Sequence, residues 1–228
     1  MEPARTIAGS QTLARGLRAL ELVAVANDGM TIQEVADRLG VHRSIASRLL
    51  ATLADFHFVM RSADGRFHLG AGVVALATGA HSTLRAVAGP IMRDLAAELD
   101  AVVALVIAEG EEALPLAMVD PPNAEYSLSY RTGTRSSSLL RGSTGAALRS
   151  VLPPRADDEP AVVEARERGY AHSFSEVVEG AYGIAAPLHG VTGLPPTCLN
   201  VVTYRADVAE AAPAPLLKSM ERLAAALR

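Results

Sequence analysis

The hydrophobic residues in the first third of the chain repeat at intervals typical of α-helices. In the first run they are separated by four, three and four positions and share one helix face: Leu13, Leu17, Leu20 and Ala24. The second run follows Thr31, and Glu34 stands where the carboxylate of a capping box would. Gly40 precedes a short turn and the third run, over residues 43–56. The pattern predicts three helices, of which the last two form a helix-turn-helix.

The predicted third helix has one apolar and one polar face. At about 100° per residue, the apolar side chains fall on one arc: Ile45, Ala46, Leu49, Leu50 and Leu53. The opposite arc carries two arginines and small residues but no acidic residue: Arg43, Ser44, Ser47 and Arg48, with Ala51. Most exposed helix faces mix acidic with basic residues, so this face is suited to a phosphate backbone or a base edge. We predict that its four polar residues face the major groove of DNA.

A β-hairpin is expected after the third helix. An Asp-Gly pair separates two short β-prone runs, 58–61 and 66–69, which is a strong hairpin signal. Arg61 and Arg66 flank the tip and are predicted to reach phosphates or the minor groove. Three helices and a basic hairpin make residues 1–70 a winged helix-turn-helix domain, although such a unit can also be a protein-interaction module.

The residues after the hairpin imitate a dinucleotide-binding motif. Residues 70–75, GAGVVA, match G-x-G-x-x-A and lead from a β-prone stretch into an apolar run. A Rossmann strand is a long apolar run within a βαβ unit, whereas the stretch before Gly70 is short and half polar. We therefore expect no nucleotide cofactor and interpret the glycines as a turn into a linker helix over 71–82.

The remaining two-thirds of the chain contain apolar strands and helices. Strands are expected at five places: 102–108, 114–119, 126–130, 184–188 and 197–204. Helices are expected after a cap at Ser82-Thr83, after a serine-rich loop at 136–138, before Gly169 and near the end: 84–99, 142–151, 161–168 and 216–227. Hairpin-connected strands with separate helices predict an antiparallel α+β domain over 83–228, with about five strands in its sheet.

Composition narrows the class of protein. Half of the 228 residues are hydrophobic and a fifth are charged, so the chain can bury a core and is not disordered. The longest apolar run, 101–108, is too short to cross a membrane and no secretory signal is visible, so we expect a cytoplasmic protein without membrane contact. The single cysteine, Cys198, excludes an internal disulfide and a multi-cysteine zinc site, and no metal is expected.

The charge is unevenly distributed. A net charge of −4 argues by itself against a nucleic-acid partner. The first 81 residues, however, hold eight arginines against seven acidic residues, whereas the remainder is acidic. The placement of arginines on the third helix and the hairpin therefore favours DNA binding despite the total charge.

Motifs of catalysis are missing from the sequence. There is no G-x-S-x-G, H-E-x-x-H or P-loop motif, and the six histidines are scattered. Cys198 lies in an apolar strand, where a free thiol is usually inert packing. We therefore expect neither an enzymatic activity nor a cofactor.

The second domain has features of a ligand site. Residues 141–145, RGSTG, run into a predicted helix, and free N–H groups at a helix start favour an anion such as a carboxylate. Asn200 is a polar residue within an apolar strand and shares one strand face with Val202. Plain N-capping by Ser143 and Thr144 and a satisfied buried amide at Asn200 explain these residues equally well.

Seven stretches, in both predicted domains, carry a family resemblance: SQTLARGLRALELVAVA at 10–26, TIQEVADRLGVHRSIASRLLATL at 31–53, the wing through Leu69, RTGTR at 131–135, GAALRSVLP at 145–153, RGYA at 168–171 and GAYGIAAPL at 180–188. In this order they resemble the IclR family of bacterial transcription regulators. The resemblance covers nearly all of residues 10–228.

This resemblance implies a winged helix that dimerises partly through its first helix, and a C-terminal GAF-like domain that binds a small metabolite, often a carboxylate. It implies homodimers, frequently paired into tetramers, that bind pseudo-palindromic operators in double-stranded DNA. By the match of motifs, the effector pocket falls at six residues: Leu128, Ser143, Thr144, Ser173, Asn200 and Val202.

The chain departs from the family pattern near this pocket. The loop after Arg135 lacks the usual P-L-H and carries about one extra residue. Residues 172–174, HSF, replace an acidic residue that is common after Gly-Tyr, and the turn GLPP at 193–196 is stiffer than usual. The pocket is therefore expected to be less charged than in other members of the family. A small acid and a larger, more apolar molecule are both candidate effectors.

Together these observations predict a homodimeric transcription regulator that binds DNA and is controlled by a small-molecule effector in its C-terminal domain. Two alternatives stay open from the sequence. The winged helix of a ligand sensor can contact a protein partner, or the C-terminal domain can be an enzyme.

Overall fold

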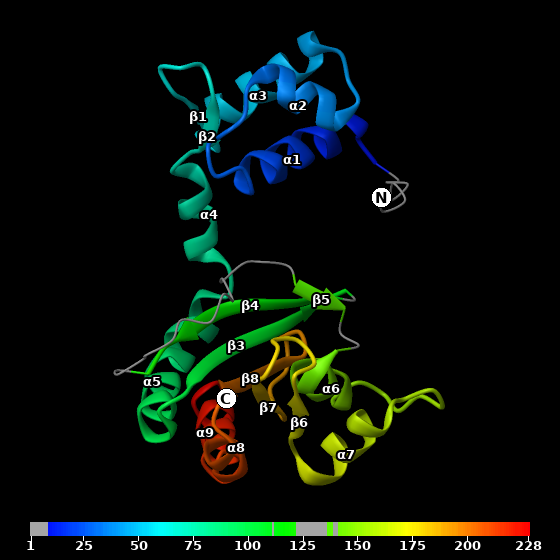
Figure 1. The fold of residues 1–228 in the computed structure, drawn as a ribbon, viewed down its shortest axis with the longest axis vertical. Coiled ribbons are helices and arrows are strands. Elements are labelled where there is room, and N and C mark those ends of the chain that lie inside the picture. The colour runs from blue at the N-terminus through cyan, green and yellow to red at the C-terminus, as the bar shows by residue number, and fades with distance from the viewer. Residues whose placement is uncertain (1–8, 111, 122–135, 139–140) are drawn as a thin grey trace. The chain divides into compact units, whose positions relative to one another are not determined.

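The computed structural model describes residues 9–110, 112–121, 136–138 and 141–228 of the chain. The chain divides into two compact units after Ala80 (Figure 1). The strand expected at 126–130 and the candidate effector residue Leu128 lie outside the described residues.

The N-terminal unit is a winged helix-turn-helix. Its elements follow one another as predicted: α1 Gln11–Ala24, α2 Ile32–Leu39, α3 Arg43–Asp55, β1 Val59–Arg61, β2 Phe67–Leu69 and α4 Gly72–Gly79. Strands β1 and β2 pair antiparallel. Gly65 at the tip has a φ of 87°, in the left-handed region that favours glycine. The predicted three helices and the hairpin are confirmed.

Local hydrogen bonds set the ends of α2 and the start of α3. The Glu34 N–H donates to the Thr31 hydroxyl at 3.2 Å, and the Thr31 N–H donates to the Glu34 carboxylate at 2.7 Å. The predicted capping box is therefore present. Gly40 ends α2 with a φ of 64°. The ring of His42 accepts the Ser44 N–H at 3.4 Å and caps α3.

The core of this unit lies where the three helices meet the hairpin. Its buried side chains come from α1, α2, α3 and both strands: Ala19, Val23, Val35, Ala36, Ala46, Leu50, Leu53, Val59 and Phe67. Met30 and Phe67 exchange two backbone hydrogen bonds of 2.9 and 2.7 Å. These bonds fix the hairpin to the segment between α1 and α2, so the wing is an integral part of the domain.

The glycines before α4 are required by close packing of the backbone. A Cβ added to Gly70 would lie 2.2 Å from the carbonyl oxygen of His57, and one added to Gly72 would lie 2.8 Å from that of Phe56. The Gly70 N–H also donates to the Phe58 carbonyl at 2.8 Å. The G-x-G-x-x-A stretch is therefore a tight turn into α4, as interpreted from the sequence.

The C-terminal unit is built on one antiparallel sheet, to which the described residues contribute six strands in the order β5-β4-β3-β8-β7-β6 (Figure 1). Their bounds are β3 Val102–Glu109, β4 Glu112–Val119, β5 Ser136–Ser138, β6 Ala171–Phe174, β7 Tyr182–Pro187 and β8 Thr197–Thr203. The α+β class and the antiparallel sheet are as predicted, but the sheet is larger than the five strands expected.

The two strands at the edges of the sheet correct the sequence prediction. β6 was not predicted, because it has four residues of which only alternate ones are buried. The serine-rich stretch 136–138 was expected to be a loop, but it forms β5 by pairing its backbone with β4. Neither edge strand has the continuous apolar run of the central strands, so pairing with a neighbour rather than side-chain pattern creates it.

Helices cover both faces of this sheet (Figure 1). Helices α5, α8 and α9 pack on one face, and α6 and α7 on the other: α5 Ser82–Leu99, α6 Gly142–Ser150, α7 Pro160–Arg168, α8 Ala206–Ala211 and α9 Pro213–Ala226. Successive residues of β3 alternate between the two cores, with Leu105 facing α5 and Ala104 facing the side of α6. Small side chains predominate on the α6 side, and they leave room for a pocket.

One predicted helix start is wrong and one predicted helix end is confirmed. α5 begins at Ser82, but neither Ser82 nor Thr83 caps it, since the N-cap position is His81 with a φ of 48° and without a side-chain hydrogen bond. α7 ends at Gly169, whose φ of 79° is left-handed as expected for a glycine stop.

Candidate DNA-binding surface and ligand pocket

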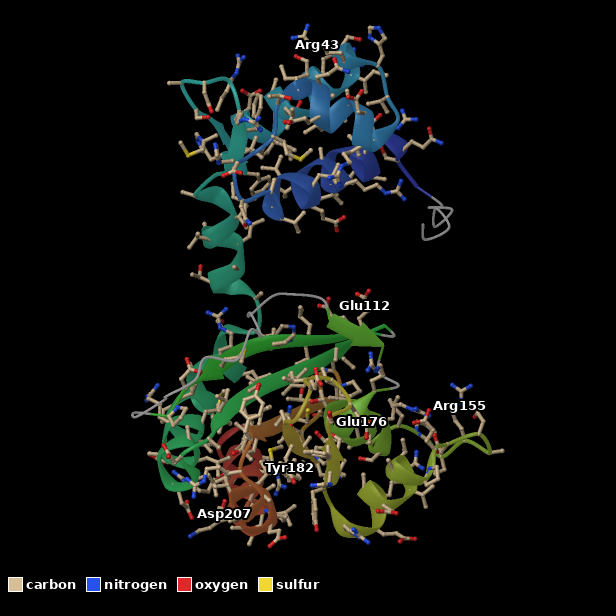
Figure 2. All side chains as sticks on the ribbon, in the orientation of Figure 1. Arg43, Glu112, Arg155, Glu176, Tyr182 and Asp207 are labelled. Carbon is tan, nitrogen blue, oxygen red and sulfur yellow. The ribbon has the colours of Figure 1, made fainter. Side chains whose placement is uncertain are left out.

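The polar residues predicted to face DNA share one exposed surface of α3, which we call the α3 surface: Arg43, Ser44, Ser47 and Arg48. On the same helix Ala46, Leu49, Leu50 and Leu53 of the apolar arc are buried, with Leu50 fully inaccessible, and Ile45 is half-buried. Figure 2 shows Arg43 at the outer edge of the N-terminal unit, on the side away from α1. The structure therefore brings all four predicted residues together, because the helix period alone places them on one face.

The start of α3 depends on His42, which the sequence pattern did not single out. Its Nδ1 accepts the Ser44 N–H and lies 3.0 Å from the Ser44 hydroxyl oxygen. The ring thus satisfies one of the N–H groups that every helix start leaves unpaired, and it orients Ser44 in the α3 surface. Histidine is not among the common N-cap residues, so the capping pattern contained no signal for this role.

The two arginines of the hairpin differ in their surroundings. Arg61 is exposed, and its guanidinium lies 5.7 Å from the centre of the Phe67 ring. Arg66 is half-buried and donates to the Gly29 carbonyl at 3.1 Å and to the Glu34 carboxylate at 3.2 Å. Arg66 therefore ties the hairpin to the start of α2, and its contact with DNA stays a prediction.

The carboxylate of Glu34 serves two parts of the domain at once. Hydrogen bonds from the Thr31 N–H and hydroxyl, followed by the Arg66 guanidinium, hold the pKa of Glu34 below its usual range. Glu34 consequently stays ionised at neutral pH, where it both caps α2 and pairs with the hairpin.

A pocket lies in the C-terminal unit, between the start of α6, the sheet and the loop 175–181 that joins β6 to β7. Its cavity volume is about 50 Å³, counted as the space that the centre of a water molecule can reach. Much of its wall is apolar: Ala104, Val106, Ala113, Pro115, Met118, Val177 and Val202. Five of the six predicted effector residues line it: Ser143, Thr144, Ser173, Asn200 and Val202.

Three polar side chains link different segments at this pocket. The Ser143 N–H donates to the Ser173 hydroxyl at 3.0 Å, and the Ser143 hydroxyl donates to Asn200 Oδ1 at 3.3 Å. Ser143 and Ser173 are buried, and Asn200 is half-buried. Asn200 therefore has a partner within the protein and also forms part of the pocket wall.

The start of α6 is not an open anion site, which corrects the expectation of free N–H groups. The Gly142 N–H donates to the Glu176 carboxylate at 3.1 Å, and the Arg141 guanidinium donates to the Glu176 carbonyl. Glu176 lies in the loop after β6, beside the start of α6 (Figure 2). Sequence reasoning missed Glu176, because 34 positions separate it from Gly142 and no local pattern joins the two.

Two glycines allow the close approach of these segments. A Cβ on Gly183 of β7 would lie 2.5 Å from Ser143 Oγ and 2.9 Å from Ser173 Oγ. A Cβ on Gly142, whose φ is 68°, would lie 2.9 Å from Cγ2 of Val177. The two hydroxyls and the loop fit around α6 only because both side chains are absent.

Comparison with known proteins identifies the N-terminal domain and two similar proteins. Residues 12–62 match the IclR helix-turn-helix domain. The HTH-type transcriptional regulator Rv1719 of Mycobacterium tuberculosis is 28% identical over 206 residues, which cover 81% of this chain and 79% of the relative. The HTH-type transcriptional regulator KipR of Bacillus subtilis is 24% identical over 185 residues, 70% of this chain and 72% of the relative. The chain therefore carries an IclR helix-turn-helix domain and is similar to these two transcriptional regulators over most of its length.

Solved structures of other proteins share the fold of this chain. An IclR transcriptional regulator from Alicyclobacillus acidocaldarius gives a TM-score of 0.80 at 20% identity, covering 96% of this chain and 100% of that chain. An IclR homologue from Microbacterium hydrocarbonoxydans, solved in complex with 4-hydroxybenzoate, gives a TM-score of 0.81 at 23% identity, with 95% and 99% covered. Both similarities extend over the winged helix and the C-terminal sheet.

Other features of this chain bear on a catalytic, metal-binding or membrane-spanning role. Cys198 is fully buried, and desolvation raises the pKa of its thiol far above the usual range. In the part of the chain that the structure describes, no group of three histidine, cysteine or acidic residues is placed to hold a metal ion. No helix among the described residues is long and apolar enough to cross a membrane. The two matched relatives are transcriptional regulators.

Proposed function

We propose that this IclR-family regulator binds double-stranded DNA through the α3 surface and changes its affinity for DNA when a small molecule occupies the pocket beside α6. The α3 surface carries the first half of the proposal, since it presents two arginines and two serines without an acidic side chain among them. An acidic residue at any of these positions would repel the phosphates that supply most of the affinity for DNA.

Within this surface the residues have different proposed roles. Arg43 and Arg48 reach base edges or phosphates in the major groove, because a guanidinium donates two parallel hydrogen bonds. The short hydroxyls of Ser44 and Ser47 let the helix approach closely. Arg61 contacts phosphates or the minor groove from the wing. Arg66, the sixth predicted DNA contact, also braces the wing, since its guanidinium has acceptors within the domain.

A homodimer is proposed from the apolar surface of the N-terminal unit. On α1, Leu13 and Leu17 are 63% and 52% exposed, and on α4, Val74 and Leu76 are 64% and 65% exposed. Large apolar side chains exposed on a helix face can mark an interaction surface, and we propose that these helices contribute to the dimer contact. Two copies related by a two-fold axis would read half-sites about 34–36 Å apart in a pseudo-palindromic operator. Pairing of such dimers would give tetramers.

The pocket is proposed as the effector site. Apolar walls with a few convergent polar groups are typical of small-molecule sites. The complex of the Microbacterium hydrocarbonoxydans homologue with 4-hydroxybenzoate supports a small-molecule ligand for this fold. Occupancy alters DNA binding only if the ligand binds the DNA-competent and incompetent states unequally, typically by about 1–3 kcal/mol.

Replacing Arg48 by alanine tests the DNA-binding half of the proposal. The side chain is exposed and lies outside the core, so the variant should fold normally. We expect the affinity for the operator to fall about tenfold or more, because one guanidinium contact to a base edge is worth about 1–3 kcal/mol. Fluorescence anisotropy with duplexes from the upstream DNA of the gene, at several salt concentrations between about 50 and 200 mM, measures the affinity and its salt dependence.

Arg155→Ala is the matched control. It removes the same charge from a residue whose side chain is 73% exposed in the other unit, so operator affinity should stay close to wild type. Operator affinity of Arg48→Ala equal to that of wild type would overturn the role of the α3 surface. A wild-type chain without salt-dependent DNA binding would instead favour a protein partner for the winged helix.

A further inference from the structure

The start of α6 holds a carboxylate that belongs to the protein itself. Gly142 is the first residue of the helix, and its N–H donates to Glu176 Oε2 at 3.1 Å. The N–H groups and the dipole at a helix start attract negative charge. Glu176 therefore occupies the position that a ligand carboxylate would take at this end of the pocket.

The loop 175–181 keeps Glu176 in this position. Ser175 has a φ of 58°; its N–H donates to the Ala181 carbonyl at 2.8 Å, and its hydroxyl accepts the Gly180 N–H at 3.0 Å. These bonds close the loop at its base. The Arg141 guanidinium donates to the Glu176 carbonyl and ties the loop to the residue before α6.

The charges of the pocket wall are few. Among the described lining residues, Glu176 is the only acidic one and Arg141 the only basic one. The other polar lining side chains are uncharged: Ser143, Thr144, Ser173, Tyr182 and Asn200. A carboxylate that enters this pocket meets a like charge at the α6 start, and like charges in contact cost free energy. An uncharged ligand of the same shape is spared this repulsion.

Building on the proposed effector pocket, we propose that Glu176 is a selectivity residue, which lowers the affinity of the pocket for carboxylates relative to uncharged ligands of the same shape. The uncharged ligand leaves Glu176 in place on the Gly142 N–H and meets the side chains of Ser143 and Asn200. A carboxylate binds well only when Glu176 gives up its position.

Matched pairs of small probes test this inference on the full chain. Benzoate and benzamide have nearly the same shape but differ in charge, and propionate and propionamide form a smaller pair. Dissociation constants come from NMR or calorimetric titrations of wild type, Glu176→Ala and Glu176→Gln. For Glu176→Ala we expect carboxylates to bind about tenfold more tightly or better, because the like charge is gone, and amides to change by less than about twofold.

Two further variants sharpen the result. Glu176→Gln keeps an oxygen acceptor for the Gly142 N–H but lacks the charge. Its affinity for carboxylates should therefore lie between that of wild type and that of Glu176→Ala. Glu179→Gln removes the same charge from the same loop, where Glu179 is exposed and does not line the pocket. This control should leave both probe classes unchanged.

The inference is overturned if Glu176→Ala raises the affinity for carboxylates no more than the affinity for amides, or if carboxylates bind to none of the variants. It is also overturned if Glu179→Gln raises the affinity for carboxylates as much as Glu176→Ala does. These outcomes leave the proposed function testable on its own. Salt-dependent operator binding by wild type is measured without any probe, and binding of amides alone would uphold the pocket while removing the role of Glu176.

Discussion

The α3 surface and the pocket are built in opposite ways. The four residues of the α3 surface lie within six consecutive positions of one helix, so the helix period decides their exposure. The polar groups of the pocket come from α6 and the residue before it, from β6, β7 and β8, and from the loop 175–181, which meet only after the sheet has formed. The exposure of residues on one element can thus be predicted from a pattern, whereas a pocket assembled from several elements needs the tertiary structure.

The two regions also differ in charge. The α3 surface carries only basic and uncharged side chains, which suits a partner as uniformly negative as the DNA backbone. The described wall of the pocket carries one charge of each sign, and the acidic one occupies the helix start. By these proposals the α3 surface attracts every phosphate, whereas the pocket distinguishes ligands by their charge.

The strongest test of this contrast removes the support of the α3 surface and leaves the pocket untouched. Leu50 is fully buried in the core of the N-terminal unit. Leu50→Ala should cost about 2–5 kcal/mol, the range for a leucine truncated in a core, and DNA binding should fall with the unfolding of this unit. Circular dichroism melting should show an earlier first transition and an unchanged transition of the C-terminal unit.

Leu199→Ala is the matched control for this truncation. Leu199 is fully buried in the core between the sheet and helices α5, α8 and α9 of the C-terminal unit. Its truncation should therefore lower the melting transition of the C-terminal unit and leave that of the N-terminal unit unchanged. If Leu50→Ala lowers the transition of the C-terminal unit as well, the two units fold as one and the contrast between the two regions is lost.

A smaller effect is expected from filling the space between β7 and α6. The Cβ of Gly183→Ala would lie 2.5 Å from Ser143 Oγ, so the backbone or the serine must shift. Overpacking of this kind costs about 1–3 kcal/mol, and probe binding in the pocket should weaken while operator binding persists. The control is Gly89→Ala in α5, whose Cβ meets only the flexible end of Arg93 at 3.5 Å. Melting and probe titration of Gly183→Ala equal to wild type would contradict a rigid pocket.

The smallest effect concerns the carboxylate that joins α2 to the wing. Because Glu34 has a lowered pKa in the folded protein, its ionised form stabilises the fold above the pKa of an unfolded glutamate, about 4.3, and this stabilisation is lost as the pH falls through the folded value. Glu34→Gln should therefore lower the melting temperature of the N-terminal unit near neutral pH, and the difference from wild type should shrink in acid.

Melting curves of the N-terminal unit between about pH 3 and 7 measure this difference across the titration of glutamate. Glu21→Gln, at an exposed position of α1, controls for the loss of one negative charge. A difference between Glu34→Gln and wild type that stays constant over the pH range would show that the charge of Glu34 contributes nothing to the cap.

Sequence reasoning succeeded where the interactions are local. The capping box joins Thr31 and Glu34, three positions apart, and Gly169 stops α7 by its own conformation. It failed at β6, whose short and half-polar sequence becomes a strand only by pairing with β7. For the pocket, the family resemblance pointed to Ser143, Ser173 and Asn200, but it held no indication of Glu176.

The sequence by itself determined the element order of the winged helix, the exposed arc of α3 and the apolar central strands, because repeats of 3.6 and two residues decide which side chains share a face. Only the tertiary structure decided that Glu176 lies on the Gly142 N–H and that Arg66 pairs with Glu34. These contacts join residues 34 and 32 positions apart. Their proximity follows from how strands pair and helices pack, and no local repeat in the chain encodes that arrangement.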